Sequence, residues 1–231
     1  MTKKIENFLD LFFPKFCFGC QREGSYLCQD CKAILQISGF HRKFQTENLS
    51  DLYFATEYKN PLIKNLIKLF KYEPFVKELA KDLASLIIDH FQLLEKNPPF
   101  LLSNSELLLI PVPSEKRRLK WRGFNQAEEV GKEIAKFLKI PLFNDVLIKN
   151  RETLAQVELS EEERKENVKE VFSCQNPEKI QEKKILLVDD VYTTGSTMKE
   201  CARVLKKAGV KEVIGLVIAR AAPGQDQFKN V

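Results

Sequence analysis

The chain has 231 residues, of which 44% are hydrophobic and 30% charged, the composition of a folded globular protein with room for one ordinary domain and a small one. The net charge of +5 and the sequence pI near 8.8 are weak evidence for an anionic partner, since the location of charge matters more than its sum. No apolar run approaches the roughly 18 residues that a membrane span needs. The N-terminal stretch, interrupted by Glu6, Asp10 and Pro14, fits an amphipathic docking helix better than a signal peptide, and we expect a cytoplasmic protein.

A cluster of cysteines is the first feature along the chain that carries chemistry. Each of its two C-x2-C turns can place two thiolates on one side of a metal, and together they complete a tetrahedron suited to Zn²⁺. The alternative is four unligated thiols. Because the protein fills all four positions, we expect structural rather than catalytic zinc, with His41 as an alternate ligand or simply a solvated residue. The predicted ligands, in the spacing C-x2-C-x7-C-x2-C, are Cys17, Cys20, Cys28 and Cys31.

The rest of the chain alternates between strand and helix patterns. We expect residues 1–50 to form a zinc-ribbon-like module with an N-terminal helix, ending in a polar connector, and residues 51–231 to form one α/β domain. A mainly parallel sheet flanked by helices follows from this alternation. The expected strands are 51–58, 106–113, 142–148, 184–190 and 212–220; the expected helices are 60–72, 76–95, 127–138 and 197–209, with a basic loop at 114–123 and a short helix at 160–167.

Two acids, Asp189 and Asp190, end the apolar run KILLVDD, and the small residues TTGST follow at once. In an open α/β sheet, ligands bind at the carboxyl ends of the strands. A helix N-terminus there offers backbone N–H groups to an anion. The acids can accept hydrogen bonds from vicinal hydroxyls, so the stretch suits a sugar phosphate, whereas the simpler alternative is that the acids only solubilise a strand end. The predicted phosphate-binding residues are Thr193, Thr194, Gly195, Ser196 and Thr197.

Basic residues interleaved with aromatic ones suit single-stranded nucleic acid, because cations follow the phosphates and rings stack on the bases. Residues 116–122 have this pattern. A face of the helix at 60–72 carries Lys64, Lys68 and Lys71, which either extend the cationic track or form a solvated face. The candidate DNA-binding residues are Arg117, Arg118, Lys120, Trp121, Arg122, Lys64 and Lys68.

Several motifs together resemble one family. ILLVDDVYTTGST is similar to the phosphoribosyl pyrophosphate (PRPP) signature of type I phosphoribosyltransferases. IPVPSEKRRLKWRGFNQAEEVGKEIA and the segment carrying Arg151, Gln156, Arg164, Asn167 and Phe172 resemble the ComF family, which is linked to DNA uptake in natural competence. The cysteine module also matches many of its members, so the resemblance covers nearly the whole chain.

The resemblance implies the site roles. Asp189 and Asp190 would be the catalytic acids that bind the ribose hydroxyls of PRPP, and residues 193–197 would hold its 5′-phosphate. Arg118, Lys120 and Arg122 would lie near the pyrophosphate, a role that competes with DNA binding or coexists with it. Mg²⁺ would be held mainly by the ligand's oxygens. Thr193 stands where purine-salvage enzymes place an acid, which makes salvage of a 6-oxopurine by that route doubtful.

Three hypotheses about function follow. The first is a transferase that uses PRPP and an unknown acceptor. The second is a PRPP-binding protein that handles incoming single-stranded DNA without turnover. The third is a scaffold whose zinc module docks a DNA-uptake helicase or another competence protein.

Overall fold

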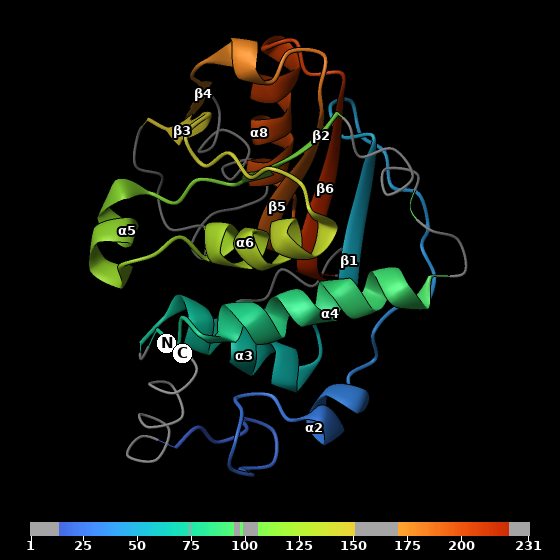
Figure 1. Ribbon diagram of the computed structural model, residues 1–231, viewed down its shortest axis with the longest axis vertical. Helices are drawn as coiled ribbons and strands as arrows, with labels where there is room; N and C mark the ends of the chain where they lie inside the picture. The colour runs from blue at the N-terminus through green and yellow to red at the C-terminus, as the bar shows by residue number, and fades with distance from the viewer. Residues whose placement is uncertain (1–13, 74, 95–97, 99–105, 151–170, 222–231) are drawn as a thin grey trace.

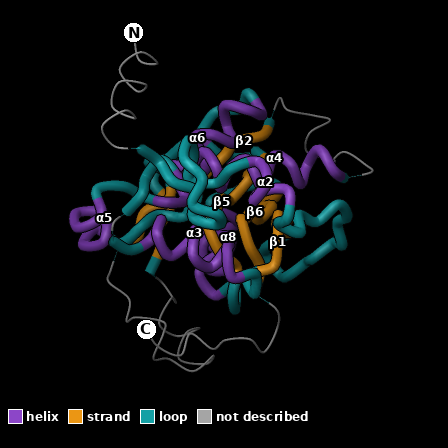
Figure 2. The backbone as a smooth tube through the Cα atoms, turned by 90° about the horizontal axis from the view of Figure 1, so that it is seen from below, coloured by secondary structure: helices purple, strands orange, loops and turns teal. Residues whose placement is uncertain are grey.

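A four-stranded parallel sheet forms the centre of the protein in the computed structural model, which describes residues 14–73, 75–94, 98, 106–150 and 171–221. The strand order is β1-β6-β5-β2, and every neighbouring pair is parallel. Figure 2 shows the strands in the middle of the molecule with helices around them. The structure therefore confirms the parallel sheet that was expected for a phosphoribosyltransferase-like α/β fold. The strands are β1 (Asp51–Glu57), β2 (Leu107–Pro111), β5 (Lys184–Tyr192) and β6 (Glu212–Arg220).

Helices cover both faces of this sheet and bury a separate apolar cluster on each. Because successive strand residues point to opposite faces, Leu186 and Val188 join the cluster under α3, α4 and α6, whereas Ile185 and Leu187 join the one under α8. The helices are α3 (Pro61–Lys71), α4 (Leu79–Leu93), α6 (Gln126–Leu138) and α8 (Ser196–Lys207) (Figure 1).

Local sequence explains where two of the helices begin. The Asn60 side chain accepts hydrogen bonds from the first amides of α3, and Pro61 occupies the first turn. Asn125 caps α6 in the same way and also donates to the carbonyl of Val112, which joins the start of α6 to the end of β2. These caps fix both helices at the carboxyl edge of the sheet.

Two expectations about secondary structure are wrong. Residues 114–123 were expected to form a loop, but most of them form a short helix, α5 (Lys116–Arg122). The helix ends at Gly123, which adopts the left-handed conformation. The strand expected over 142–148 is reduced to a bridge at Leu142 and to β3 (Leu147–Lys149), which pairs antiparallel with β4 (Phe172–Cys174) in a second small sheet. The expected helices at the N-terminus and at 160–167 lie outside the described residues.

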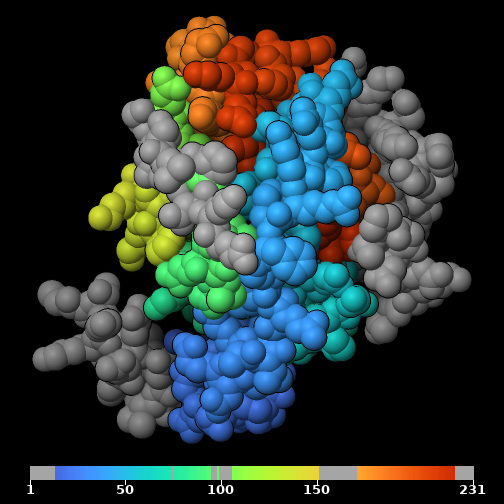
Figure 3. Space-filling view, turned by 90° about the vertical axis from the view of Figure 1, so that its right-hand side faces the viewer, coloured from blue at the N-terminus to red at the C-terminus, as the bar shows by residue number. Residues whose placement is uncertain are grey.

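The cysteine module lies at one end of the molecule, in blue in Figures 1 and 3. It contains α2 (Gln29–Ala33), and its buried residues Cys17, Leu27 and Leu35 belong to the same apolar cluster as residues of α3 and α4. Lys32 forms an ion pair of 2.7 Å with Asp89 of α4. The boundary predicted at residue 50 remains a prediction.

Within the described ranges, no helix is long and apolar enough to cross a membrane. A 3-10 turn, η3 (Pro177–Lys179), follows β4.

Candidate functional sites

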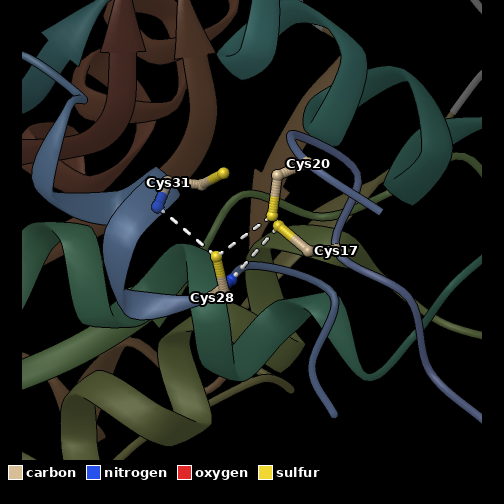
Figure 4. A group of neighbouring side chains, drawn as sticks. All are labelled: Cys17, Cys20, Cys28 and Cys31. Atoms are coloured by element: carbon tan, nitrogen blue, oxygen red, sulfur yellow. Dashed lines mark hydrogen bonds between the residues drawn. The ribbon is translucent and has the colours of Figure 1, made fainter. Parts of the chain in front are cut away.

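The four cysteines of the predicted zinc site come together. Their sulfur atoms all lie within 4.8 Å of one another, and Cys20 Sγ is 3.5 Å from Cys28 Sγ. Thiolates bound tetrahedrally at about 2.3 Å from zinc are about 3.8 Å apart, so the cluster fits one zinc ion. Figure 4 shows the pairs Cys17–Cys20 and Cys28–Cys31 entering from two separate segments.

Backbone geometry supports the cluster. The N–H of Cys28 donates to Cys17 Sγ at 3.3 Å, and the N–H of Cys31 donates to Cys28 Sγ at 3.4 Å. Burial disfavours the Cys17 thiolate, but nearby backbone N–H groups, led by that of Cys28, outweigh it and lower the pKa of Cys17 to about 6. A Cβ on Gly19 would lie 2.6 Å from Cys31 Sγ, so the close approach of the two turns requires glycine there.

His41 takes no part in this cluster. Its ring stacks on Tyr53 with centroids 3.9 Å apart, and its Nε2 lies 3.0 Å from Asp51 Oδ2. The side chain is only 18% exposed, so the expectation of a solvated residue is wrong. His41 instead ties the connector to the start of β1.

The two acids of the predicted ligand site lie at the carboxyl end of β5, and their partners come from different elements. Asp190 is 6% exposed, and its Oδ1 lies 2.9 Å from the Nζ of Lys71, the last residue of α3. Asp189 affects the buried Cys201 thiol of α8 electrostatically, and its Oδ1 accepts the N–H of Asp190 at 2.9 Å. The acids thus sit side by side but project toward the helices on opposite faces of the sheet.

Burial raises the pKa of Asp189 to about 7, with a further contribution from the negative charge of Asp190 and a smaller opposing one from Lys71. Burial also raises the pKa of Cys201, which is fully enclosed. Asp189 is therefore a carboxyl group that readily gains or loses a proton near neutral pH.

The predicted phosphate loop connects β5 to α8. Gly195 adopts a left-handed conformation (φ 74°) before the first turn of the helix. The Oγ1 of Thr194 lies 2.8 Å from the Oγ of Ser196 and accepts the N–H of Ser196 at 3.3 Å. The Nζ of Lys199 donates to the carbonyl of Thr194 at 3.2 Å, which adds a cation beside the loop. Loop hydroxyls, the helix N-terminus and this lysine together favour an anion.

Tyr192 packs beneath this loop. A Cβ on Gly195 would lie 2.1 Å from the Tyr192 Cζ and hydroxyl oxygen, so only glycine fits. The hydroxyl is buried with no hydrogen-bond partner among the described residues. Burial raises the pKa of Tyr192 to about 12, so the ring stays neutral.

The basic residues of α5 divide into two groups. Arg122 is half-buried, donates to the side chain of Gln126 and interacts electrostatically with Asp190. Arg118 Nε lies 3.6 Å from the buried carboxylate of Glu115, which neutralises part of its charge. Arg117 and Lys120 are exposed, as is Trp121, whose ring meets Phe75 edge-on at 4.7 Å.

The predicted DNA-binding lysines of α3 divide in a similar way. Lys64 and Lys68 are exposed, and Lys64 lies 5.9 Å from the centre of the Tyr58 ring. Lys71, predicted to share their face, is half-buried and pairs with Asp190. Its helical position gives no hint of this pairing, because only the tertiary packing of α3 against β5 creates it. The sequence analysis therefore did not predict that Lys71 lies beside the acids.

Comparison with known proteins agrees with this arrangement. Residues 125–229 match the model of the phosphoribosyl transferase domain. Competence protein F of Haemophilus influenzae is 30% identical over 90% of this chain and 86% of its own length. Competence protein ComFC of Streptococcus pneumoniae is 29% identical over 85% of this chain and 77% of its own. DNA utilization protein YhgH of Shigella flexneri is 35% identical over 46% of this chain and 45% of its own. The chain belongs to the ComF family of competence-related proteins, and its α/β domain is a phosphoribosyltransferase fold with a cysteine cluster that can hold zinc at its N-terminal end.

Proposed function

We propose that this protein binds PRPP with Mg²⁺ at the carboxyl edge of its sheet and handles incoming single-stranded DNA in the cytoplasm during natural transformation. The ribose hydroxyls donate to Asp189 and Asp190, and the 5′-phosphate binds in the loop of residues 193–197. Mg²⁺ supplies charge neutralisation for the pyrophosphate when it is bound. The zinc in the cysteine module is structural.

The observation that carries the PRPP proposal is the junction of β5 and α8. Two carboxyl groups suited to vicinal hydroxyls lie near the carboxyl end of β5, and the loop that suits a phosphate begins at Thr193, directly after the last strand residue, Tyr192. Arg122, Lys71 and Lys199 surround the junction with positive charge. A ribose that carries phosphates matches this arrangement, because its hydroxyl groups can donate to the acids while its phosphates accept from the loop and the cations.

The DNA proposal is supported by the exposed side of α5. Arg117 and Lys120 are available for phosphates, and Trp121, 58% exposed, offers a ring face for a base. Tyr72, 51% exposed, adds a second ring at the end of α3. These residues adjoin Arg122 and Lys71, so the proposed DNA surface borders the proposed PRPP site.

A thermal-shift titration tests PRPP binding. PRPP with Mg²⁺ should raise the melting temperature of the wild type, because a ligand that binds only the folded state stabilises it. The variant Asp189→Asn/Asp190→Asn should show little or no shift. A wild type that is not stabilised would remove the PRPP proposal.

A salt series with a fluorescent single-stranded oligonucleotide tests the DNA surface. The variant Arg117→Ala/Lys120→Ala/Trp121→Ala should bind more weakly, and its slope of log affinity against log salt should fall by about 0.7 for each phosphate contact removed. Lys136→Ala, an exposed lysine of α6, is the matched control. PRPP binding should persist in Lys136→Ala, and its persistence in the triple variant would assign Lys120 to DNA rather than to the pyrophosphate. Equal DNA binding by the triple variant and the wild type would contradict the assignment.

A docking role for the module is a second candidate. Ile34 and Phe40 are 72% and 79% exposed, and Leu93 at the end of α4 is 54% exposed near Gly39. Exposed apolar side chains of this kind suit a protein partner, for which we propose a DNA-uptake helicase. Ile34→Ser/Phe40→Ser should lower transformation while leaving zinc content and PRPP binding unchanged. Unchanged transformation would contradict this role.

A further inference from the structure

An ion pair occupies one of the two acids proposed to bind ribose. The Nζ of Lys71 lies 2.9 Å from Asp190 Oδ1, with the lysine side chain 30% exposed and the aspartate side chain 9% exposed. A charge-assisted hydrogen bond in so enclosed a place is strong. A ribose hydroxyl that donates to the same carboxylate oxygen must therefore displace the ammonium group.

A second cation already stands beside Asp190. Arg122 is half-buried at the end of α5; burial lowers the pKa of its guanidinium, and the negative charge of Asp190 opposes this shift in part. Its guanidinium donates to Gln126, but its Nε is buried and has no hydrogen-bond partner among the described residues. A buried donor without an acceptor costs free energy that a bound anion would recover. Asp190 thus interacts with two cations, Lys71 and Arg122, and the Nε of Arg122 has no acceptor among the described residues.

Lysine suits a group that changes partners. Its ammonium is a compact charge on a flexible four-carbon stem with three donors, so it can turn toward a new anion without a fixed geometry. In PRPP the pyrophosphate is attached to the same ribose whose hydroxyls would reach Asp190. An ammonium displaced from Asp190 by the ribose would then lie close to the most highly charged part of the ligand.

We propose that Lys71 is a positioning residue that passes from Asp190 to the pyrophosphate of PRPP when the ribose hydroxyls reach Asp190. This inference rests on the proposed PRPP site. Without ligand, the charge of Asp190 is neutralised by Lys71. The exchange of partners would make the affinity for PRPP higher than that for ribose 5-phosphate. Displacing Lys71 disfavours both ligands, whereas only PRPP offers the lysine a new partner.

The test compares the affinities of two ligands by isothermal titration calorimetry with Mg²⁺ present. In Lys71→Met, PRPP affinity should fall by about 10- to 100-fold, the range expected for one hydrogen bond between charged groups. Affinity for ribose 5-phosphate should not fall and should rise if anything, since this ligand no longer has to displace the lysine and gains no contact from it. Lys71→Arg should restore most of the preference for PRPP. Lys136→Met should match the wild type.

A purely structural ion pair gives a different result. Losing it would weaken both ligands by the same factor, and an unchanged ratio of the two affinities would overturn the proposal, as would unchanged PRPP affinity in Lys71→Met. A wild type that binds neither ligand would instead remove the proposed PRPP site, an outcome distinguishable from both.

Lys71→Met leaves Asp190 buried without its lysine and risks misfolding. The comparison of Asp190→Asn with Asp190→Asn/Lys71→Met avoids this, because neither variant contains the Asp190 carboxylate that would be left without its lysine. Inorganic pyrophosphate with Mg²⁺ is the probe. It should bind more tightly to Asp190→Asn than to the wild type, and the added Lys71→Met substitution should abolish the gain. A gain that persists in the double variant would overturn the proposal.

Discussion

The cysteine module and the carboxyl edge of the sheet differ in how their reactive groups are held. In the module, four sulfur atoms converge with backbone N–H groups pointing at two of them. At the carboxyl edge, by contrast, Asp190 is paired with Lys71 and Arg118 with Glu115. The module has the geometry of a site for a tightly held metal ion. At the carboxyl edge, the charged side chains neutralise one another, which suits the reversibly bound ligand that we propose.

Removing the metal should have the largest effect. Cys17 and Cys31 are buried in the same cluster as α3 and α4, so loss of zinc should expose part of the core as well as the module. We expect Cys17→Ser/Cys31→Ser to lower the free energy of unfolding by roughly 5 kcal/mol or more, since structural zinc binding is coupled to folding. Urea unfolding and metal analysis measure this.

Cys174→Ser, in β4 and outside the module, is the control and should unfold like the wild type. Purified protein that contains no zinc and melts at the same temperature with and without a chelator would contradict the prediction. The module would then be held by its apolar contacts alone.

Gly195→Ala should produce the next largest effect, this time at the carboxyl edge. The new methyl group would need a left-handed backbone and would overlap the Tyr192 ring, which together should cost about 2–4 kcal/mol of folding free energy. PRPP binding should be lost with the loop geometry. Thermal and urea unfolding measure the first effect and calorimetry the second.

Gly123→Ala separates the two causes. Gly123 has a similar φ of 82° but open space around its Cβ, so it should lose only about 1 kcal/mol. Tyr192→Leu should partly rescue Gly195→Ala by removing the ring. Equal losses for the two glycine variants would mean that the contact with Tyr192 has no energetic weight.

The pH dependence of stability should isolate Asp189. Its pKa is raised from the unfolded value of roughly 3.9 to about 7, so the fold favours the protonated form. This contribution to stability is fully present below about pH 4 and is lost as pH rises through 7. Between pH 5 and 8 the wild type should therefore lose roughly 2.5 kcal/mol relative to Asp189→Asn.

Urea unfolding of both proteins at pH 5, 6, 7 and 8 gives the comparison. The difference between their free energies of unfolding should change with pH in that window, with the wild type falling relative to the variant. Parallel curves would show that Asp189 keeps an ordinary pKa and that the acids are more solvated than their burial indicates.

Local patterns in the sequence predicted the parts of the protein that depend on local structure. The cysteine spacing predicted the convergence of four sulfur atoms, and the run KILLVDD predicted a buried strand with two acids near its end, although β5 continues two residues beyond them to Tyr192. The wrong expectation for residues 114–123 has a local cause as well, because the dense charge of KRRLKWR hid good helix formers ended by a glycine. Pairs such as Lys71–Asp190 and Arg118–Glu115 escaped prediction for a different reason. They depend on which helix packs beside which strand end and on how side chains bend, which no periodicity in the sequence encodes.

The smallest effect should come from the contact between the module and the domain. Lys32 and Asp89 form an ion pair of 2.7 Å whose side chains are 14% and 32% exposed, so solvent screens it only in part. A double-mutant cycle with Lys32→Ala and Asp89→Ala should give a coupling energy of about 0.5–1 kcal/mol. Arg22–Asp30 within the module, with side chains 65% and 69% exposed, is the control and should give almost none. Both cycles should leave PRPP binding unchanged, because neither pair lies near the acids. A coupling at Lys32–Asp89 that alters PRPP affinity would show that the cysteine module and the proposed PRPP site are linked through α4.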